Sequence, residues 1–159
     1  MDESFGTGEL DRTDMKILRL LQEDGRLGNA EIAKRVHTSP ATCHRRIQRL
    51  FDQGHITAVR GQIAPERVGR GTLAMVGVVL DRSTPESFGA FEAAIRTLPV
   101  VLDCHLVAGD FDYFLKIRVR DMADFNRLHG KTLIALPGVR QTRTFFVMKE
   151  VVDNAPLDF

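Results

Sequence analysis

The sequence predicts an α+β protein in which an N-terminal helix-turn-helix precedes a ferredoxin-like βαββαβ domain. Three observations support this fold class. A basic segment near the N-terminus has the periodicity of short helices, two of which are separated by a tight turn. The rest of the chain repeats a strand-helix-strand pattern. Both copies of that pattern leave the helix through the same dipeptide, at Leu98-Pro99 and at Leu136-Pro137.

Composition excludes several classes of protein. The chain has 159 residues, of which 43% are hydrophobic and 27% are charged, as in ordinary globular proteins. No apolar run approaches the roughly 18 residues of a membrane span. Residues 1–9 lack the basic start and apolar centre of a secretory signal, so we expect a disordered tail and a cytoplasmic protein. Cys43 and Cys104 lie in apolar patterns and are expected to be small buried side chains.

Charge is concentrated in one segment. The net charge of the chain is only +1, which argues against a protein that coats nucleic acid through bulk electrostatics. However, the segment from Arg26 to Arg60 holds seven basic residues and two acidic ones. A local surplus of this kind indicates a DNA-binding surface.

The N-terminal helices can be placed from periodicity and capping signals. The first runs from Arg12 to Glu23 and stops at Asp24-Gly25, and the second runs from Asn29, its expected N-cap, to Val36. The third follows Ser39-Pro40, an N-cap and a first-turn proline, and ends at Asp52. Since only two residues separate the last two helices, residues 10–55 are predicted to form a helix-turn-helix.

The third helix has two distinct faces. Cys43, Ile47, Leu50 and Phe51 form an apolar arc, and the opposite face is polar and basic. A recognition helix reads base edges near its N-terminus and meets phosphates elsewhere, so Thr42 and Arg45 are the expected base contacts. The alternative is a solvated basic face without a partner. The full predicted DNA-binding set is Ser39, Pro40, Thr42, His44, Arg45, Arg46 and Arg49, with Ser39, Arg46 and Arg49 on phosphates.

Residues 56–63 are compatible with a short hairpin or with an extended connection. A hairpin linker over residues 56–71 is expected to lead into the second domain, residues 72–152, with a tail over 153–159. Strands are predicted at 73–80, 100–107, 113–119 and 139–151, and helices at 85–98 and 122–136.

Both helices would cover one face of the sheet and leave the other bare. In the second strand both faces carry apolar side chains, so we expect a second subunit to cover the bare face.

Two segments of this domain carry candidate chemistry. Asp103 and His105 share a face of the second strand, and an interfacial pair is favoured over proton transfer, since no nucleophile or metal spacing accompanies them. The turn Gly109–Tyr113 is compatible with ordinary hairpin chemistry. It is also compatible with a zwitterionic ligand, because Asp can pair with an ammonium group while turn amides bind a carboxylate.

Taken together, these motifs resemble the Lrp/AsnC (feast/famine) family of transcriptional regulators over Leu10 to about Val151. The segments that carry the resemblance are Leu10-Asp11-Arg12-Thr13-Asp14, Asp24-Gly25-Arg26, Ser39–Cys43, Arg45–Leu50, Gly54-His55-Ile56, Cys104–Tyr113 and Leu136–Val139. The resemblance implies a winged-type helix-turn-helix, a C-terminal ligand-sensing and oligomerisation (RAM) domain, and homodimers that assemble to octamers with effector bound between dimers. By position it implies effector contacts from Leu106, Gly109, Asp110, Asp112, Met122, Phe145, Phe146 and Val147.

The sequence departs from the family pattern at two of its positions. His37 stands in the helix-turn-helix turn where glycine is common, so a non-glycine residue must adopt a left-handed backbone there. Phe145 stands where tyrosine is frequent, which removes a hydroxyl near the implied effector.

The leading hypothesis is a sequence-specific regulator that binds double-stranded DNA and responds to an amino acid or related small metabolite. The alternative is an architectural protein that wraps DNA with little sequence preference and no effector. An enzyme is disfavoured because no catalytic pair, phosphate loop or metal cluster is found, so no cofactor and no metal are expected, and no membrane partner.

Overall fold

The computed structural model describes residues 10–159, so the expected disordered tail over residues 1–9 lies outside the described residues. The chain divides into two compact units. One, which we call the head, contains residues 10–62 and also Val152–Phe159. The other, the sheet domain, is Ile63–Val151. The backbone therefore leaves the head once and returns to it at the C-terminal end.

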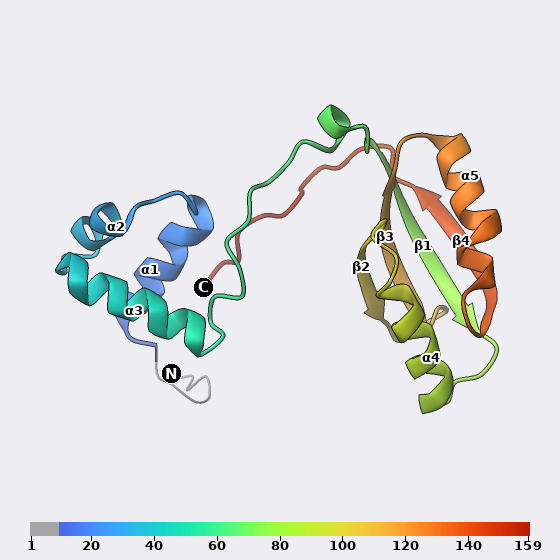
Figure 1. The fold of residues 1–159 in the computed structure, drawn as a ribbon, viewed down its shortest axis with the longest axis horizontal. Helices are drawn as coiled ribbons and strands as arrows, with labels where there is room; N and C mark the ends of the chain where they lie inside the picture. The colour runs from blue at the N-terminus through green and yellow to red at the C-terminus, as the bar shows by residue number, and fades with distance from the viewer. Residues whose placement is uncertain (1–9) are drawn as a thin grey trace. The chain divides into compact units, whose positions relative to one another are not determined.

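The head contains three helices, α1 (Arg12–Glu23), α2 (Asn29–Arg35) and α3 (Pro40–Asp52) (Figure 1). Their bounds agree with the predicted ones to within a residue, and the predicted helix-turn-helix is confirmed. Residues from all three helices form its buried core, and these are Ile17, Ile32, Ala33, Val36, Cys43 and Leu50. Cys43 is fully buried, as its place in the apolar arc predicts, and burial raises the pKa of its thiol.

Local capping interactions fix the helix starts. The Ser39 hydroxyl caps α3 by accepting a hydrogen bond from the Thr42 amide. At α2 the prediction is wrong: Gly28 is the N-cap, and the Asn29 side chain instead donates to the Pro40 carbonyl at 2.8 Å. Asn29 thus ties the start of α2 to the start of α3. His37 has φ of 57°, which confirms the left-handed turn between these helices.

The linker differs from the expected hairpin. Residues 57–64 are extended without strand pairing, and a 3-10 turn, η1, follows at Pro65–Val68. A hairpin needs two paired runs of backbone amides and carbonyls around a tight turn. Here the apolar run Ile56–Val59 has no second run before Pro65, which cannot donate to a strand ladder.

The sheet domain has the predicted ferredoxin-like topology, which confirms the α+β fold class. Its antiparallel strands lie in the order β2-β3-β1-β4. The strands are β1 (Thr72–Leu80), β2 (Val101–Leu106), β3 (Tyr113–Val119) and β4 (Val139–Phe146). The helices α4 (Pro85–Ile95) and α5 (Met122–Lys131), followed by the 3-10 turn η2 (Leu133–Ala135), pack on one face of this sheet.

The core of the sheet domain lies between that face and the helices. Alternate residues of β1, such as Val76 and Val78, are buried against Phe91 of α4 and Phe125 of α5. Tyr113 is also buried, with its ring centroid 4.6 Å from that of Phe91, and its hydroxyl donates to the Glu92 carboxylate at 2.9 Å. Burial, reinforced by Glu92, raises the pKa of this hydroxyl well above its usual value.

Two strand predictions need correction. The ladder between β2 and β3 shifts register between Val101 and Asp103. Because of this irregularity, Val101 packs with Cys104 against the helix-side core, rather than opposite it as simple alternation predicts. Strand β4 ends at Phe146 instead of continuing to Val151. Among residues 10–159, no helix combines the length and the apolar character needed to cross a bilayer.

Candidate DNA-binding and effector sites

One face of α3 is open to solvent. Ala41, His44, Arg45 and Gln48 are all exposed on it. Within the described part of the chain, Arg45 forms no ion pair, so its guanidinium is available to an external partner. Since Arg45 lies nearly two turns beyond the Ser39 cap, it is still in the N-terminal half of α3, the half that a recognition helix directs toward base edges.

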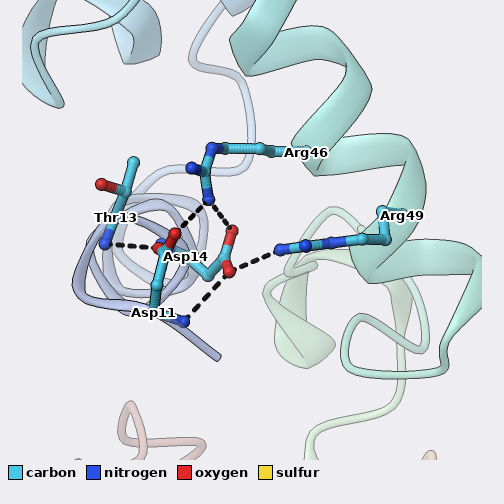
Figure 2. Close-up of polar contacts among 5 residues, drawn as sticks. All are labelled: Asp11, Thr13, Asp14, Arg46 and Arg49. Carbon is cyan, nitrogen blue, oxygen red and sulfur yellow. Dashed lines mark hydrogen bonds and ion pairs between the residues drawn. The ribbon is translucent and has the colours of Figure 1, made fainter. Parts of the chain in front are cut away.

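Arg46 and Arg49, unlike Arg45, bind carboxylates at the start of α1 (Figure 2). Arg46 Nη1 lies 2.6 Å from Asp11 Oδ2 and 2.9 Å from Asp14 Oδ1, while Arg49 Nη2 binds the second oxygen of Asp14. The Asp14 side chain is only 1% exposed. We call these four residues the arginine clamp, because they hold α3 against the start of α1.

The clamp perturbs the ionisation of Asp11 and Arg46. Hydrogen bonding by the Asp14 backbone N–H, with a further contribution from Arg46, lowers the pKa of the Asp11 carboxyl. Hydrogen bonds to Asp11 and Asp14 raise the pKa of Arg46 in turn. Both shifts favour the charged forms of Asp11 and Arg46, so these two residues form an ion pair at neutral pH.

The clamp residues still reach the surface beside Arg45. The Arg46 and Arg49 side chains remain 26% and 44% exposed. Together with Arg45 they line a depression of about 180 Å³. The structure thus brings the three predicted arginines together, but only Arg45 has its full charge uncompensated by the carboxylates of α1.

The remaining residues of the predicted DNA-binding set lie at the start of α3. Ser39 Oγ donates to Thr42 Oγ1 at 2.9 Å, so both hydroxyls take part in the helix cap. Pro40 is the first helical residue and is exposed. Sequence reasoning missed Asp11 and Asp14 as members of this site. The sequence signal that could have revealed them is a pair of aspartates three residues apart at the start of a helix, a pattern typical of a capping box.

The predicted effector residues lie at two ends of the sheet. Leu106 pairs with Tyr113, and the turn with Gly109, Asp110 and Asp112 follows it, beside the end of β1. Phe146 pairs with Ala74 near the start of β1, at the other end. The Val147 amide continues this pairing by donating to the Leu73 carbonyl. Met122 begins α5 shortly after the end of β3, which lies beside the start of β1. A single chain therefore does not gather the eight residues into one pocket.

Asp112 has a structural role that the sequence did not reveal. Its carboxylate accepts a hydrogen bond from the Leu80 backbone amide at 2.7 Å, and its own amide donates to the Val78 carbonyl. It thus fixes the end of β1 at the irregularity between Val79 and Leu80. The binding of a ligand ammonium group by this carboxylate stays a prediction. Asp110 in the same turn is exposed and forms no ion pair with any residue from 10 to 159.

Phe145 and Phe146 point to opposite faces of the sheet. The Phe146 ring lies 5.0 Å from Phe125 of α5, on the helix side. The Phe145 ring lies on the face without helices, 6.4 Å from Phe111 and 6.3 Å from Phe114. The ring of Phe111 lies directly over Gly77, where a Cβ atom would come within 2.6 Å of it. The predicted bare face is therefore partly covered by an aromatic cluster of its own.

No group of three or more His, Cys, Asp or Glu side chains suited to a metal ion occurs among the described residues.

Comparison with protein families matches residues 10–50 to the AsnC-type helix-turn-helix domain and residues 73–157 to the Lrp/AsnC ligand binding domain. The chain belongs to the Lrp/AsnC family. It is a transcriptional regulator, with a helix-turn-helix domain and a ligand-binding domain, and not an enzyme.

Relatives of this Lrp/AsnC regulator agree in both sequence and structure. The leucine-responsive regulatory proteins of Salmonella typhimurium and Escherichia coli K12 are each 46% identical over 143 residues, or 90% of this chain and 87% of theirs. A transcriptional regulator of Neisseria meningitidis, crystallised as an L-Met complex, is 37% identical with a TM-score of 0.88, over 94% of this chain and 97% of that one. An AsnC family regulator from Agrobacterium tumefaciens is 30% identical with a TM-score of 0.87 and the same coverage.

Proposed function

We propose that this Lrp/AsnC regulator recognises specific operator sequences in double-stranded DNA and that an amino acid or related small metabolite modulates its binding. One observation carries the proposal: Arg45 is exposed on α3 and forms no ion pair with residues 10–159, in a chain that also has a ligand-binding domain. The complex of the Neisseria meningitidis relative with L-Met supports an amino acid as the class of ligand.

The geometry of α3 suggests roles for the individual side chains. Arg45 can bind the O6 and N7 atoms of guanine with both arms of its guanidinium, and Thr42 lies one turn earlier on the same helix. Arg46 and Arg49 retain exposed edges next to Arg45, which suits contact with phosphate oxygens. Ser39, Pro40 and His44 border this surface. In a two-fold symmetric dimer, two such helices read half-sites about one helical turn apart.

For the effector, we infer a site assembled from more than one copy of the chain. Phe146 and Val147 pair beside the start of β1, whereas the turn with Gly109 and Asp110 lies beside its end, so we expect different copies to supply these two groups to one small ligand. Dimers that associate further, as in an octamer, provide such a junction. Within the turn, Asp110 is the more accessible partner for a ligand ammonium group, because its side chain is exposed whereas Asp112 is half-buried and accepts a hydrogen bond from Leu80.

The DNA-binding proposal is tested by selecting an operator from random duplexes and measuring affinities by fluorescence anisotropy at fixed salt. We expect a specificity ratio of about a thousandfold or more over random DNA. Arg45→Ala is expected to reduce discrimination by roughly 5- to 150-fold, corresponding to about 1–3 kcal/mol for a bidentate base contact. Arg140→Ala removes the same charge from an exposed position in the sheet domain and serves as the control.

Two results would contradict this proposal. Full specificity in the Arg45→Ala variant would remove Arg45 from the base-reading surface. Near-equal affinity of the unaltered protein for selected and random DNA would favour the architectural alternative, for which the phosphate-facing edges of Arg46 and Arg49 would be sufficient.

The effector proposal is tested by thermal denaturation in the presence of each of the twenty amino acids. A ligand at about a hundred times its Kd adds roughly 2.7 kcal/mol of stability. Asp110→Asn is expected to abolish the shift without changing the stability of the ligand-free protein. Asp112→Asn is expected to weaken the end of β1 as well as the response. A full ligand shift in the Asp110→Asn protein would exclude Asp110 from the site.

A further inference from the structure

The C-terminal end of the chain binds the head through its main chain. The Gln22 side-chain amide on α1 accepts a hydrogen bond from the Leu157 N–H at 2.8 Å and donates to the Leu157 carbonyl at 3.0 Å. Both polar groups of one residue's backbone are thus satisfied by a single side chain. This is the pairing that a neighbouring β-strand would offer, and it fixes both the position and the direction of the segment.

Arg19, one turn before Gln22, makes a second contact. Its guanidinium donates to the Phe159 carbonyl oxygen through Nε, at 2.6 Å, and through Nη2. The same guanidinium lies 5.5 Å from the centre of the Phe159 ring. Arg19 and Gln22 are both exposed residues of α1, so the docked segment uses neither the head's core nor the exposed face of α3.

This contact gives the head a second connection to the sheet domain. The first is the linker, which is extended and exposed over residues 57–64. The second runs from the end of β4 into Val152–Phe159, which belong to the head. A domain held by one extended linker samples many orientations, and a second attachment removes part of that freedom before any ligand binds.

We propose that Leu157–Phe159 dock on Arg19 and Gln22 as a strap that restricts the orientations of the DNA-binding head, so that paired heads prefer half-sites of one spacing. The role in DNA binding rests on the function proposed above, whereas the docking does not. The strap is reversible, since its bonds are solvent-accessible and the Leu157 side chain is 75% exposed. It is therefore a point at which the sheet domain can tighten or release the head.

Docking is tested without DNA by hydrogen exchange of the full-length protein. The variants are Gln22→Ala and Arg19→Ala, and the matched controls are Glu23→Ala and Arg12→Ala, which alter exposed residues of α1 that make no contact with the strap in the described structure. We expect exchange at 152–159 to be about tenfold faster in the two strap variants and unchanged in the controls. Exchange of this segment at the unprotected rate in the unaltered protein would overturn the proposal.

A fluorescent reporter provides an independent measurement. The chain has no Trp, so Phe159→Trp places a single indole at the docking site. The indole also binds a guanidinium more strongly than phenyl does. Addition of Arg19→Ala to this protein is expected to shift the emission to that of a solvated indole. Identical emission with and without Arg19 would show that the ring is not docked.

The role in DNA binding is tested with operators whose two half-sites are moved apart one base pair at a time. The unaltered protein is expected to show a sharp optimum, and Gln22→Ala a flatter profile with about tenfold weaker binding at that optimum. Affinity for a single half-site should be the same in both. An identical spacing profile for the two proteins would overturn the strap's role. If the unaltered protein shows no preference for operator over random DNA, the proposed function fails, and the strap's role in spacing fails with it.

Discussion

Replacement of Asp14 by Asn is the sharpest test of how the head is held together. The buried carboxylate accepts hydrogen bonds from Arg46, from Arg49 and from the Asp11 backbone amide at 3.1 Å. A net value of about 1.5–3 kcal/mol applies to each charge-assisted bond in a buried site. Both arginines retain access to water and can be rehydrated when released, so each bond is assigned a value at the low end of this free-energy range. The two bonds to arginine together give an expected loss of about 2–4 kcal/mol.

Hydrogen exchange is the appropriate assay, because the single Tyr of the chain is Tyr113 in the sheet domain and no Trp reports on the head. The slowest amides of α1 and α3 exchange when the head opens as a whole, and a loss of about 2–4 kcal/mol speeds that exchange roughly 30- to 1000-fold. Asp52→Asn, at an exposed position at the end of α3, is the control. Exchange within a factor of about three of the unaltered protein would refute the structural role of the clamp.

Three further predictions concern single positions. Gly77→Ala is expected to destabilise the sheet domain by about 1–3 kcal/mol, because the new methyl group would overlap the Phe111 ring; an unchanged denaturation midpoint would contradict this. The pKa of the Asp11 carboxyl is lowered in the folded head. The ionised carboxylate therefore contributes its full stabilisation of the head above the ordinary pKa of 3.8, and this contribution is lost as the pH falls through the folded-state pKa. Asp11→Asn should therefore lower the melting temperature of the head at neutral pH and have little effect near pH 2, and a pH-independent difference would oppose this. His37→Gly is expected to stabilise the head by about 0.5–1 kcal/mol by relieving the left-handed backbone, as a higher melting temperature would show.

Features set by local sequence were predictable. The bounds of α1 follow from its apolar spacing and from the Asp24-Gly25 stop, and the start of α3 follows from Ser39-Pro40. These signals act within one or two turns of helix, so no knowledge of tertiary structure is needed. The N-cap of α2 was not predictable in this way, because the Asn29 side chain is used eleven residues away, at the Pro40 carbonyl.

Features set by the packing of separate elements were not predictable. The basic face of α3 was evident from the sequence, but the neutralisation of Arg46 and Arg49 depends on how α1 crosses α3 and where that crossing places Asp14. For the same reason, Asp112 in a turn is equally compatible with a free carboxylate and with one bound to Leu80. Strand alternation failed in β2, where the irregularity beside Val101 shifts the register.

The return of the chain's last residues to α1 also orders events during synthesis. The core of the head lies entirely within residues 10–56, so its three helices can pack soon after they leave the ribosome. The bonds between Gln22 and Leu157 join residues 135 positions apart and cannot form until the whole sheet domain has been made. A nascent chain therefore carries a folded but unrestrained head, and the head becomes restrained only after residues 157–159 have been made.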